Sequence, residues 1–399
     1  MAMNPGLEKL QLYPFQRLNQ IKTNSSPPKG SEIIDLSIGE PQLETPLIIQ
    51  ESLKRAISGI GKYPNTRGTL RLRESISTWA TKRFNLGKEE LLADQNILPV
   101  SGTREALFAI AQTLVAANSE KSLVGLPNPF YQIYEGAAIL AGATPYYFNG
   151  PAHNNFSPLF EDTPEEIWQK MSFMYICSPG NPAGNVMTSQ QYAYLISMAD
   201  KHNFFIVVDE CYSELYGNEE HPPLGILEWC HLSGRRSFQR CLAMHSLSKR
   251  SNSPGLRSGF VAGDPDLIEK FFMYRTYHGS AMPLHVQEAS ITAWSDEEHV
   301  IANRDFYRRN FDAVLNVLRE KIDVNRPAAG FYLWIDVLSD DIKVCEQLYS
   351  RTGLIVLPGQ FLSRKNDGLN PGTNRIRLAL VAPKEQCIEA AHRLLSIIS

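Results

Sequence analysis

The sequence predicts an α/β fold, with a mostly parallel sheet in a large domain and a smaller α+β domain. Between residues 97 and 263, short apolar segments alternate with segments that have helical spacing. Continuously apolar short strands are typical of a parallel sheet that is covered by helices on both faces. After about residue 290 the alternation gives way to a long helical pattern and two strand-like segments, which indicates the second domain.

The composition is that of an ordinary soluble globular protein. The chain has 399 residues, of which 43% are hydrophobic and 20% charged, and its formal net charge is −3. This charge provides no basic face, so we expect neither nucleic acid nor a membrane as a partner. The six cysteines form no C-x-x-C pair, and no apolar run approaches the roughly 18 residues that span a bilayer. We therefore predict a cytoplasmic protein with reduced thiols and no metal site.

Residues 1–45 are predicted to form an N-terminal arm and part of the small domain. Within residues 5–22, leucines at irregular helical spacing are interrupted by Pro14, which predicts an arm followed by a short helix. A strand-like segment at 33–38 then ends at a Gly-Glu-Pro turn. The arm is thus expected to lead directly into the large domain.

The large domain is predicted to span residues 46–289, and the small C-terminal domain residues 290–399. Helices of the large domain are expected at 46–58, 70–83, 103–117, 133–141 and 189–203. Its strands are expected at 97–100, 123–126, 145–148, 173–177, 204–208, 240–245 and 259–262. The small domain is expected to contain a long helix at 297–321, a strand at 331–336, a helix, a strand at 375–380 and a closing helix.

Lys249 stands out because small hydroxyl residues surround it and a second cation, Arg257, follows. Strand-like flanks place it on a loop just past a strand end, where open α/β sheets bind their ligands. Burial and a neighbouring cation, Arg250 or Arg257, would lower its pKa so that the amine can attack a carbonyl carbon. Taken alone, a lysine is more often on a solvated loop. The Ser246-x-x-Lys249 spacing also occurs in serine acyl-enzymes, but the Lys-Thr-Gly and Ser-Asp-Asn motifs of that class are missing.

Other predicted strands also end in polar residues. Residues 101–103 form a strand-to-helix turn where free backbone N–H groups favour an anion. Asn181 lies on a rigid Pro/Gly turn, and Asp209 ends a strand three residues before Tyr212. Each feature has a plain alternative as a helix cap or a turn residue. Only their combination points to one ligand.

A cofactor with a phosphate, a pyridinium nitrogen, a phenolic oxygen and an aldehyde would use all of these residues, and pyridoxal 5′-phosphate has these four groups. Asp209 would keep the ring nitrogen protonated, Asn181 and Tyr212 would donate to the phenolic oxygen, and Lys249 would take the aldehyde. Tyr131 could stack on the ring. The predicted phosphate ligands are Ser101, Gly102, Thr103, Ser246, Ser248 and Arg257.

The joint pattern resembles the class I and II aminotransferases of fold type I over nearly the whole chain. The motifs that carry the resemblance are Gly39-Glu-Pro41, Tyr63, Ser101-Gly-Thr103, Asn181-Pro182-x-Gly184, Asp209-Glu-x-Tyr212, Ser246-x-Ser248-Lys249 and Arg257-x-Gly259. The resemblance implies that Lys249 binds the cofactor and then moves a proton at the substrate Cα. It further implies that Arg377 binds the substrate α-carboxylate near the Gly39 backbone, although Arg375 shares the same strand face. Tyr63 would reach the phosphate of the neighbouring subunit in a homodimer.

The substrates implied are an amino acid and a 2-oxo acid. The aspartate branch of the family has an extra arginine where this sequence has Tyr277 and His278, which argues against aspartate. The N-terminal segment, residues 4–18, is similar to that of N-succinyldiaminopimelate aminotransferases, which implies N-succinyl-LL-2,6-diaminopimelate and 2-oxoglutarate. The candidate cations for the distal end of such a substrate are Arg17, Arg67, Arg275 and Arg375.

Several alternatives stay open at this point. Another aminotransferase of the family, specific for aspartate, kynurenine or an aromatic amino acid, would share these motifs, and so would a β-elimination lyase that uses the same cofactor. A regulatory protein with an aminotransferase-like domain would need a DNA-binding module, and no basic recognition helix precedes the first motif.

Overall fold

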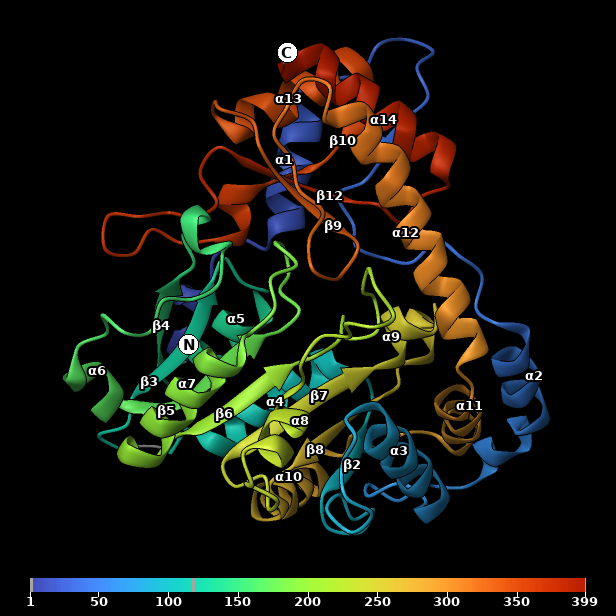
Figure 1. The fold of residues 1–399 in the computed structure, drawn as a ribbon, viewed down its shortest axis with the longest axis vertical. Coiled ribbons are helices and arrows are strands. Elements are labelled where there is room, and N and C mark those ends of the chain that lie inside the picture. Colours follow the sequence, from blue (N-terminus) through green and yellow to red (C-terminus); the bar gives the residue numbers. More distant parts are fainter. Residues whose placement is uncertain (1–2, 117–118, 399) are drawn as a thin grey trace.

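The computed structural model describes residues 3–116 and 119–398. A seven-stranded sheet forms the centre of the larger of its two domains (Figure 1). The strand order is β2-β8-β7-β6-β5-β3-β4, and only β8 runs antiparallel to its neighbours. The bounds are β2 (Ile97–Val100), β3 (Leu123–Asn128), β4 (Thr144–Asn149), β5 (Met171–Cys177), β6 (Phe205–Asp209), β7 (Cys241–Ser246) and β8 (Gly259–Gly263). The predicted mostly parallel sheet is confirmed.

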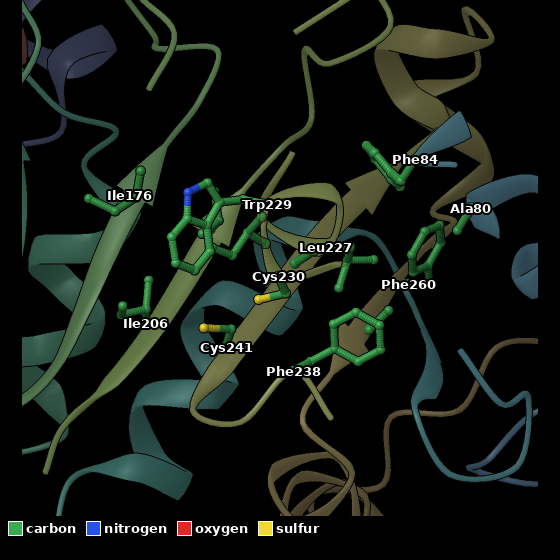
Figure 2. Packing of buried hydrophobic residues seen from close by; sticks show 14 of the residues in the cluster. Ala80, Phe84, Ile176, Ile206, Leu227, Trp229, Cys230, Phe238, Cys241 and Phe260 are labelled. Carbon is green, nitrogen blue, oxygen red and sulfur yellow. The ribbon is translucent and has the colours of Figure 1, made fainter. Parts of the chain in front are cut away.

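Helices cover both faces of this sheet, which we call the large domain. They are α2 (Leu47–Arg55), α3 (Leu70–Arg83), α4 (Thr103–Leu114), α5 (Ile133–Leu140), α6 (Glu165–Gln169), α7 (Ser189–His202), α8 (Ile226–Leu232), α9 (Leu247–Arg250), α10 (Pro265–His278) and α11 (Leu284–Ser295). Side chains alternate across each strand, so Phe173 and Tyr175 of β5 pack with α4, α5 and α10 while Met174 and Ile176 pack on the opposite face. Figure 2 shows that second cluster, with Trp229 of α8 over the strands.

The small domain contains the antiparallel sheet β11-β12-β9 and the helices that cover it. Its elements are α12 (Glu298–Leu318), β9 (Tyr332–Asp336), α13 (Asp341–Thr352), β10 (Leu354–Ile355), β11 (Leu357–Pro358), β12 (Arg375–Ala379) and α14 (Lys384–Ile398). The N-terminal segment carries a 3₁₀ turn (Pro5–Lys9), α1 (Pro14–Asn24) and β1 (Ile34–Asp35), and β1 pairs with β10. Helix α12, orange in Figure 1, runs from the α11 region into the small domain. The domain boundaries at 45/46 and 289/290 stay predictions.

Several local predictions were wrong or incomplete. Lys249 lies in the four-residue helix α9 and not on a loop, because Ser246 caps this turn by accepting from the Ser248 N–H at 3.1 Å. Strand β7 begins at Cys241 because Arg240 has a φ of +67°, which no strand residue adopts. Helices α8, α10 and α11 had no prediction. The helix expected at 103–117 ends at Leu114, and Ala117 lies outside the described residues.

The six cysteines are free thiols, and all except the half-buried Cys211 are buried. Within residues 3–116 and 119–398, no helix has the length and apolar character needed to cross a membrane.

Candidate active site

A cavity of about 590 Å³ lies where the large domain, the small domain and the N-terminal segment meet. Strands β5, β6 and β7 are parallel, so their carboxyl ends deliver side chains to the same edge of the sheet. This explains why Asn181, Asp209, Ser246, Ser248 and Lys249 come together. Most of the predicted residues line this cavity. They are Gly39, Thr103, Tyr131, Asn181, Asp209, Tyr212, Ser246, Ser248, Lys249, Arg257 and Arg377.

The Lys249 amine is held inside the cavity. Its Nζ donates to the Gly39 carbonyl oxygen at 2.6 Å. Burial lowers the pKa of Lys249 to about 8; Arg377 and Arg257 add to this effect, and Cys211 and Glu40 oppose it. Of the two cations that the sequence offered to lower the pKa of Lys249, Arg250 and Arg257, it is therefore Arg257 that acts on the amine.

Arg250 does not have that role, because it points away from the amine. Its guanidinium is buried, pairs with Glu297 and donates to the Ala293 carbonyl oxygen at 2.6 Å. Arg250 thus joins α9 to the α11–α12 region and helps to hold in place the helix that carries Lys249.

The lowered pKa of Lys249 predicts a pH dependence of cofactor capture. Only the neutral amine attacks an aldehyde, and the neutral fraction rises as pH passes through the folded-state pKa. We expect the rate at which cofactor-free protein captures pyridoxal 5′-phosphate to rise with a midpoint near pH 8, whereas an exposed lysine would titrate near about 10.4. Stopped-flow absorbance across this range measures it, with Nα-acetyllysine, whose only amine is the side-chain amine, as the control for titration of the cofactor itself. A midpoint near the Nα-acetyllysine value would contradict the prediction.

Asp209 ends β6 as a buried carboxylate with fixed hydrogen bonds. Its Oδ2 accepts from the Tyr134 hydroxyl at 2.7 Å and its Oδ1 from the Cys211 N–H at 3.2 Å. Burial raises the pKa of Asp209, and the hydrogen bonds from Cys211 and Tyr134 oppose that shift because they favour the charged form. Tyr134, stacked on Tyr175 with ring centroids 4.7 Å apart, was missed in the sequence. The only feature of the sequence that could have indicated Tyr134 as a site residue is its position three residues after Tyr131.

Four of the six predicted phosphate ligands, Thr103, Ser246, Ser248 and Arg257, line the cavity, whereas Ser101 and Gly102 directly precede α4 and do not line it. Gly102 has a φ of +87°, and a Cβ there would collide with the Arg257 guanidinium, so glycine at this position lets Arg257 lie against the start of α4. Arg257 itself adopts the left-handed conformation, with a φ of +54°, and donates to the Ser101 carbonyl oxygen at 3.4 Å. The Ser246 hydroxyl donates to Ser248 Oγ at 3.0 Å. Helix N–H groups, hydroxyls and an arginine fit the phosphate of pyridoxal 5′-phosphate.

Arg377 faces the cavity, and Arg375 does not. The Nη atoms of Arg377 donate to Asn181 Oδ1 at 2.8 Å and to the Ser37 carbonyl oxygen at 2.7 Å. Its buried Nε has no hydrogen-bond partner among the described residues. Arg375 pairs with Asp336 at 2.8 Å and is not on the cavity wall. The geometry therefore favours Arg377 as the carboxylate ligand.

The four predicted cations for the distal end of the substrate do not line the cavity of the described chain. Arg275 is fully buried against Glu105, so that prediction was wrong. Arg67 pairs with Glu269, and the Arg17 guanidinium lies 3.8 Å from the centroid of the Phe361 ring.

Arg104 lies on the cavity wall instead and was missed. Its Nε donates to the Tyr131 hydroxyl at 2.9 Å and its Nη2 to the Tyr13 hydroxyl at 2.6 Å. Its position directly after Ser101-Gly-Thr103 could have identified it, because the start of a helix in this motif faces the ligand.

Tyr63 lies apart from the other predicted residues. It is fully exposed and does not line the cavity of its own chain. Its expected role across a dimer interface and the stacking of Tyr131 on the cofactor ring both stay predictions.

The sheet, with its lysine, buried carboxylate and phosphate cradle, defines a transferase of fold type I, the class that uses pyridoxal 5′-phosphate. The chain belongs to the aminotransferase class I and II family, whose model matches residues 31–394. Enzymes of this family use amino acids and 2-oxo acids as substrates.

Similar proteins cover the whole chain. It is 31% identical over 395 residues to LL-diaminopimelate aminotransferase from Aquifex aeolicus, which is 97% of each protein. An aminotransferase from Neisseria meningitidis of known crystal structure is 43% identical, with a TM-score of 0.95 and complete coverage of both chains. A probable N-succinyldiaminopimelate aminotransferase from Thermus thermophilus has a TM-score of 0.82 over 96% of this chain and 99% of its own, and at 24% identity it shows the fold alone.

Proposed function

We propose that this aminotransferase moves an amino group between a diaminopimelate, free or N-succinylated, and 2-oxoglutarate in the biosynthesis of lysine and diaminopimelate. The observation that carries the proposal is the presence of two arginines that line the cavity, Arg377 of β12 for the reacting end of the donor and Arg104 of α4 for a charged distal end. The name of the Aquifex aeolicus relative supports a diaminopimelate donor. We place the enzyme in the cytoplasm.

The roles of the site residues follow from their positions. The bound cofactor supplies an electron sink for bond changes at the substrate Cα. Lys249 would hold the cofactor and later, as a neutral amine, move the proton at the substrate Cα. Asp209, fixed by its hydrogen bonds, would accept from the ring nitrogen. Arg377 would orient the substrate α-carboxylate, and the apolar side chains of Leu357 and Leu362 on the cavity wall would exclude water.

Two charged residues of the cavity lining have no proposed role towards the cofactor or the α-carboxylate, and they bear on which donor the enzyme uses. They are Glu40 and Arg104, one anion and one cation. Free LL-diaminopimelate has a distal ammonium and a distal carboxylate that could pair with them. The N-succinyl form has two distal carboxylates and no ammonium, which would leave Glu40 unpaired. The resemblance of the N-terminal segment supports the succinylated donor, and the charge pattern supports the free one.

A panel of donors tests the proposal. Purified protein is mixed with 2-oxoglutarate and with LL-diaminopimelate, its N-succinyl form, aspartate, kynurenine or aromatic amino acids, and the glutamate formed is measured. We expect the highest kcat/KM with one of the two diaminopimelates. Activity confined to the other donors would refute the donor assignment. Release of ammonia and pyruvate from an amino acid with a leaving group on Cβ, such as cystathionine, in the absence of 2-oxoglutarate would indicate a β-elimination lyase.

Substitution of Arg104 tests the distal contact directly. Arg104→Met keeps the length of the side chain but removes its charge, and a hydrogen bond to a charged group contributes about 1.5–3 kcal/mol. We expect KM for a diaminopimelate to rise by roughly 10- to 150-fold with little change in kcat. KM for 2-aminoheptanoate, which has no distal charge, should not change. Arg351→Met, at an exposed position of α13, is the control. An equal rise for both donors would contradict the assignment.

We further propose a homodimer with shared active sites. Tyr63 is fully exposed, and the nearby Ile57 and Ile60 are 53% and 69% exposed, so this surface offers apolar area for a second copy. Analytical ultracentrifugation should show a dimer, and a monomer at assay concentration would refute the proposal.

A further inference from the structure

Tyr332 contacts three functional parts of the cavity, although no sequence motif points to it. It is the first residue of β9 in the small domain and is 3% exposed. Its hydroxyl lies 3.0 Å from that of Tyr212, which belongs to the large domain. The Arg377 guanidinium carbon lies 4.3 Å from the centroid of its ring. A Cβ at residue 39 would collide with the Tyr332 hydroxyl, so the Tyr332 position requires Gly39.

The two hydroxyls share one hydrogen bond, which leaves one hydrogen free to donate elsewhere. The Tyr332 hydroxyl is packed against the Gly39 backbone, whose carbonyl oxygen already accepts from Lys249. When Tyr332 donates to Tyr212, the hydrogen of Tyr212 is available to the cavity. Tyr212 is then also a stronger donor, because hydrogen bonds in a chain polarise one another.

The ring of Tyr332 acts on the other end of the site. A guanidinium over an aromatic face is attracted to it. With the Nη atoms of Arg377 bound to Asn181 and Ser37, the ring fixes the plane of the guanidinium. Its unpaired Nε is then held in place for a carboxylate.

We propose that Tyr332 is a positioning residue with two separable effects. Its hydroxyl keeps Tyr212 as a donor towards the phenolic oxygen of the cofactor, and its ring holds Arg377 for the substrate carboxylate. The inference rests on the proposed roles of Tyr212 and Arg377, but not on the identity of the amino donor.

The variant Tyr332→Phe removes only the hydroxyl. We expect kcat to fall and KM to change little, and the affinity of cofactor-free protein for pyridoxal 5′-phosphate, measured by fluorescence, to weaken roughly two- to tenfold. The pH at which the absorption of bound cofactor changes should move upward, because the ionised phenolic oxygen loses part of its hydrogen bonding. Wild-type values for both the affinity and this pH would overturn the role of the hydroxyl.

Tyr307→Phe is the matched control. Tyr307 belongs to the same hydrophobic cluster and is 2% exposed, but its hydroxyl has no hydrogen-bond partner among the described residues. We expect this variant to keep the wild-type absorption and cofactor affinity. A shift as large as that of Tyr332→Phe would show that any buried hydroxyl in this cluster has the effect, and would overturn the specific role.

A double variant tests whether Tyr332 acts through Tyr212. If it does, adding Tyr332→Phe to Tyr212→Phe should cause no further change in kcat or in the absorption of bound cofactor. Additive losses would overturn the coupling.

The variant Tyr332→Leu removes the ring as well. We expect KM for both the donor and 2-oxoglutarate to rise roughly two- to thirtyfold above that of Tyr332→Phe, since the cation loses its aromatic partner. An unchanged KM in a protein with a normal melting curve would overturn the role of the ring. If the wild type transaminates none of the donors, the proposed function fails. Cofactor affinity and the absorption titration then still test the role of the hydroxyl.

Discussion

Replacement of Lys249 by alanine is expected to abolish transamination and the visible absorption of bound pyridoxal 5′-phosphate. Lys249 is the one lysine among the described residues that line the cavity. No other amine there can hold the aldehyde or move the proton at the substrate Cα. Because both functions are lost together, we expect turnover to fall by about 10⁴-fold or more. Absorbance of the reconstituted protein and glutamate formation measure the two losses.

Two further variants make this result specific. Lys270→Ala removes an exposed lysine of α10 and should keep both colour and turnover. Lys249→Arg keeps a cation at residue 249, but a guanidinium stays protonated and does not attack an aldehyde. It should therefore be as inactive as Lys249→Ala. A coloured, active Lys249→Ala variant would refute the assignment of the catalytic lysine.

The strands could be predicted because burial on both faces leaves a local signal. Strands such as β5 are apolar along their whole length, and turns rich in glycine or proline bound them. Helix α10 left no such signal. Leu267, Ile268 and Phe271 are buried while Met273 is 52% exposed, so its apolar residues do not form a single stripe.

The candidate site was predictable wherever a motif and a strand end coincide. Asn181, Asp209 and Lys249 each follow a parallel strand, and the shared carboxyl edge brings them to one cavity. Tyr332 left no comparable signal, because its contact with Tyr212 depends on how the small domain packs against the large one. Arg275 was a wrong candidate for the distal end of the substrate for a related reason. Arginines such as Arg275 are paired through tertiary contacts that cannot be read from sequence spacing.

Replacement of Arg377 by alanine is expected to raise KM for every amino donor and also for 2-oxoglutarate. All of these substrates carry a carboxylate next to the reacting carbon, and the guanidinium would bind it through two parallel N–H groups. Loss of such a buried ion pair costs about 2–4 kcal/mol, which corresponds to a rise of roughly 30- to 1000-fold. Steady-state kinetics with two unrelated donors measures the effect.

Arg375→Ala is the matched control, because it removes the same side chain two residues away on β12. Arg375 pairs with Asp336 outside the cavity, so its loss should leave KM unchanged. Arg377→Lys keeps the charge but not the planar pair of donors, and we expect a KM between those of the wild type and Arg377→Ala. Asn181 and Ser37 occupy the two Nη atoms, so an incoming carboxylate must use the free Nε and displace or share one of these bonds. If Arg375→Ala raised KM and Arg377→Ala did not, the carboxylate would bind at Arg375, and the cavity would not be the substrate site.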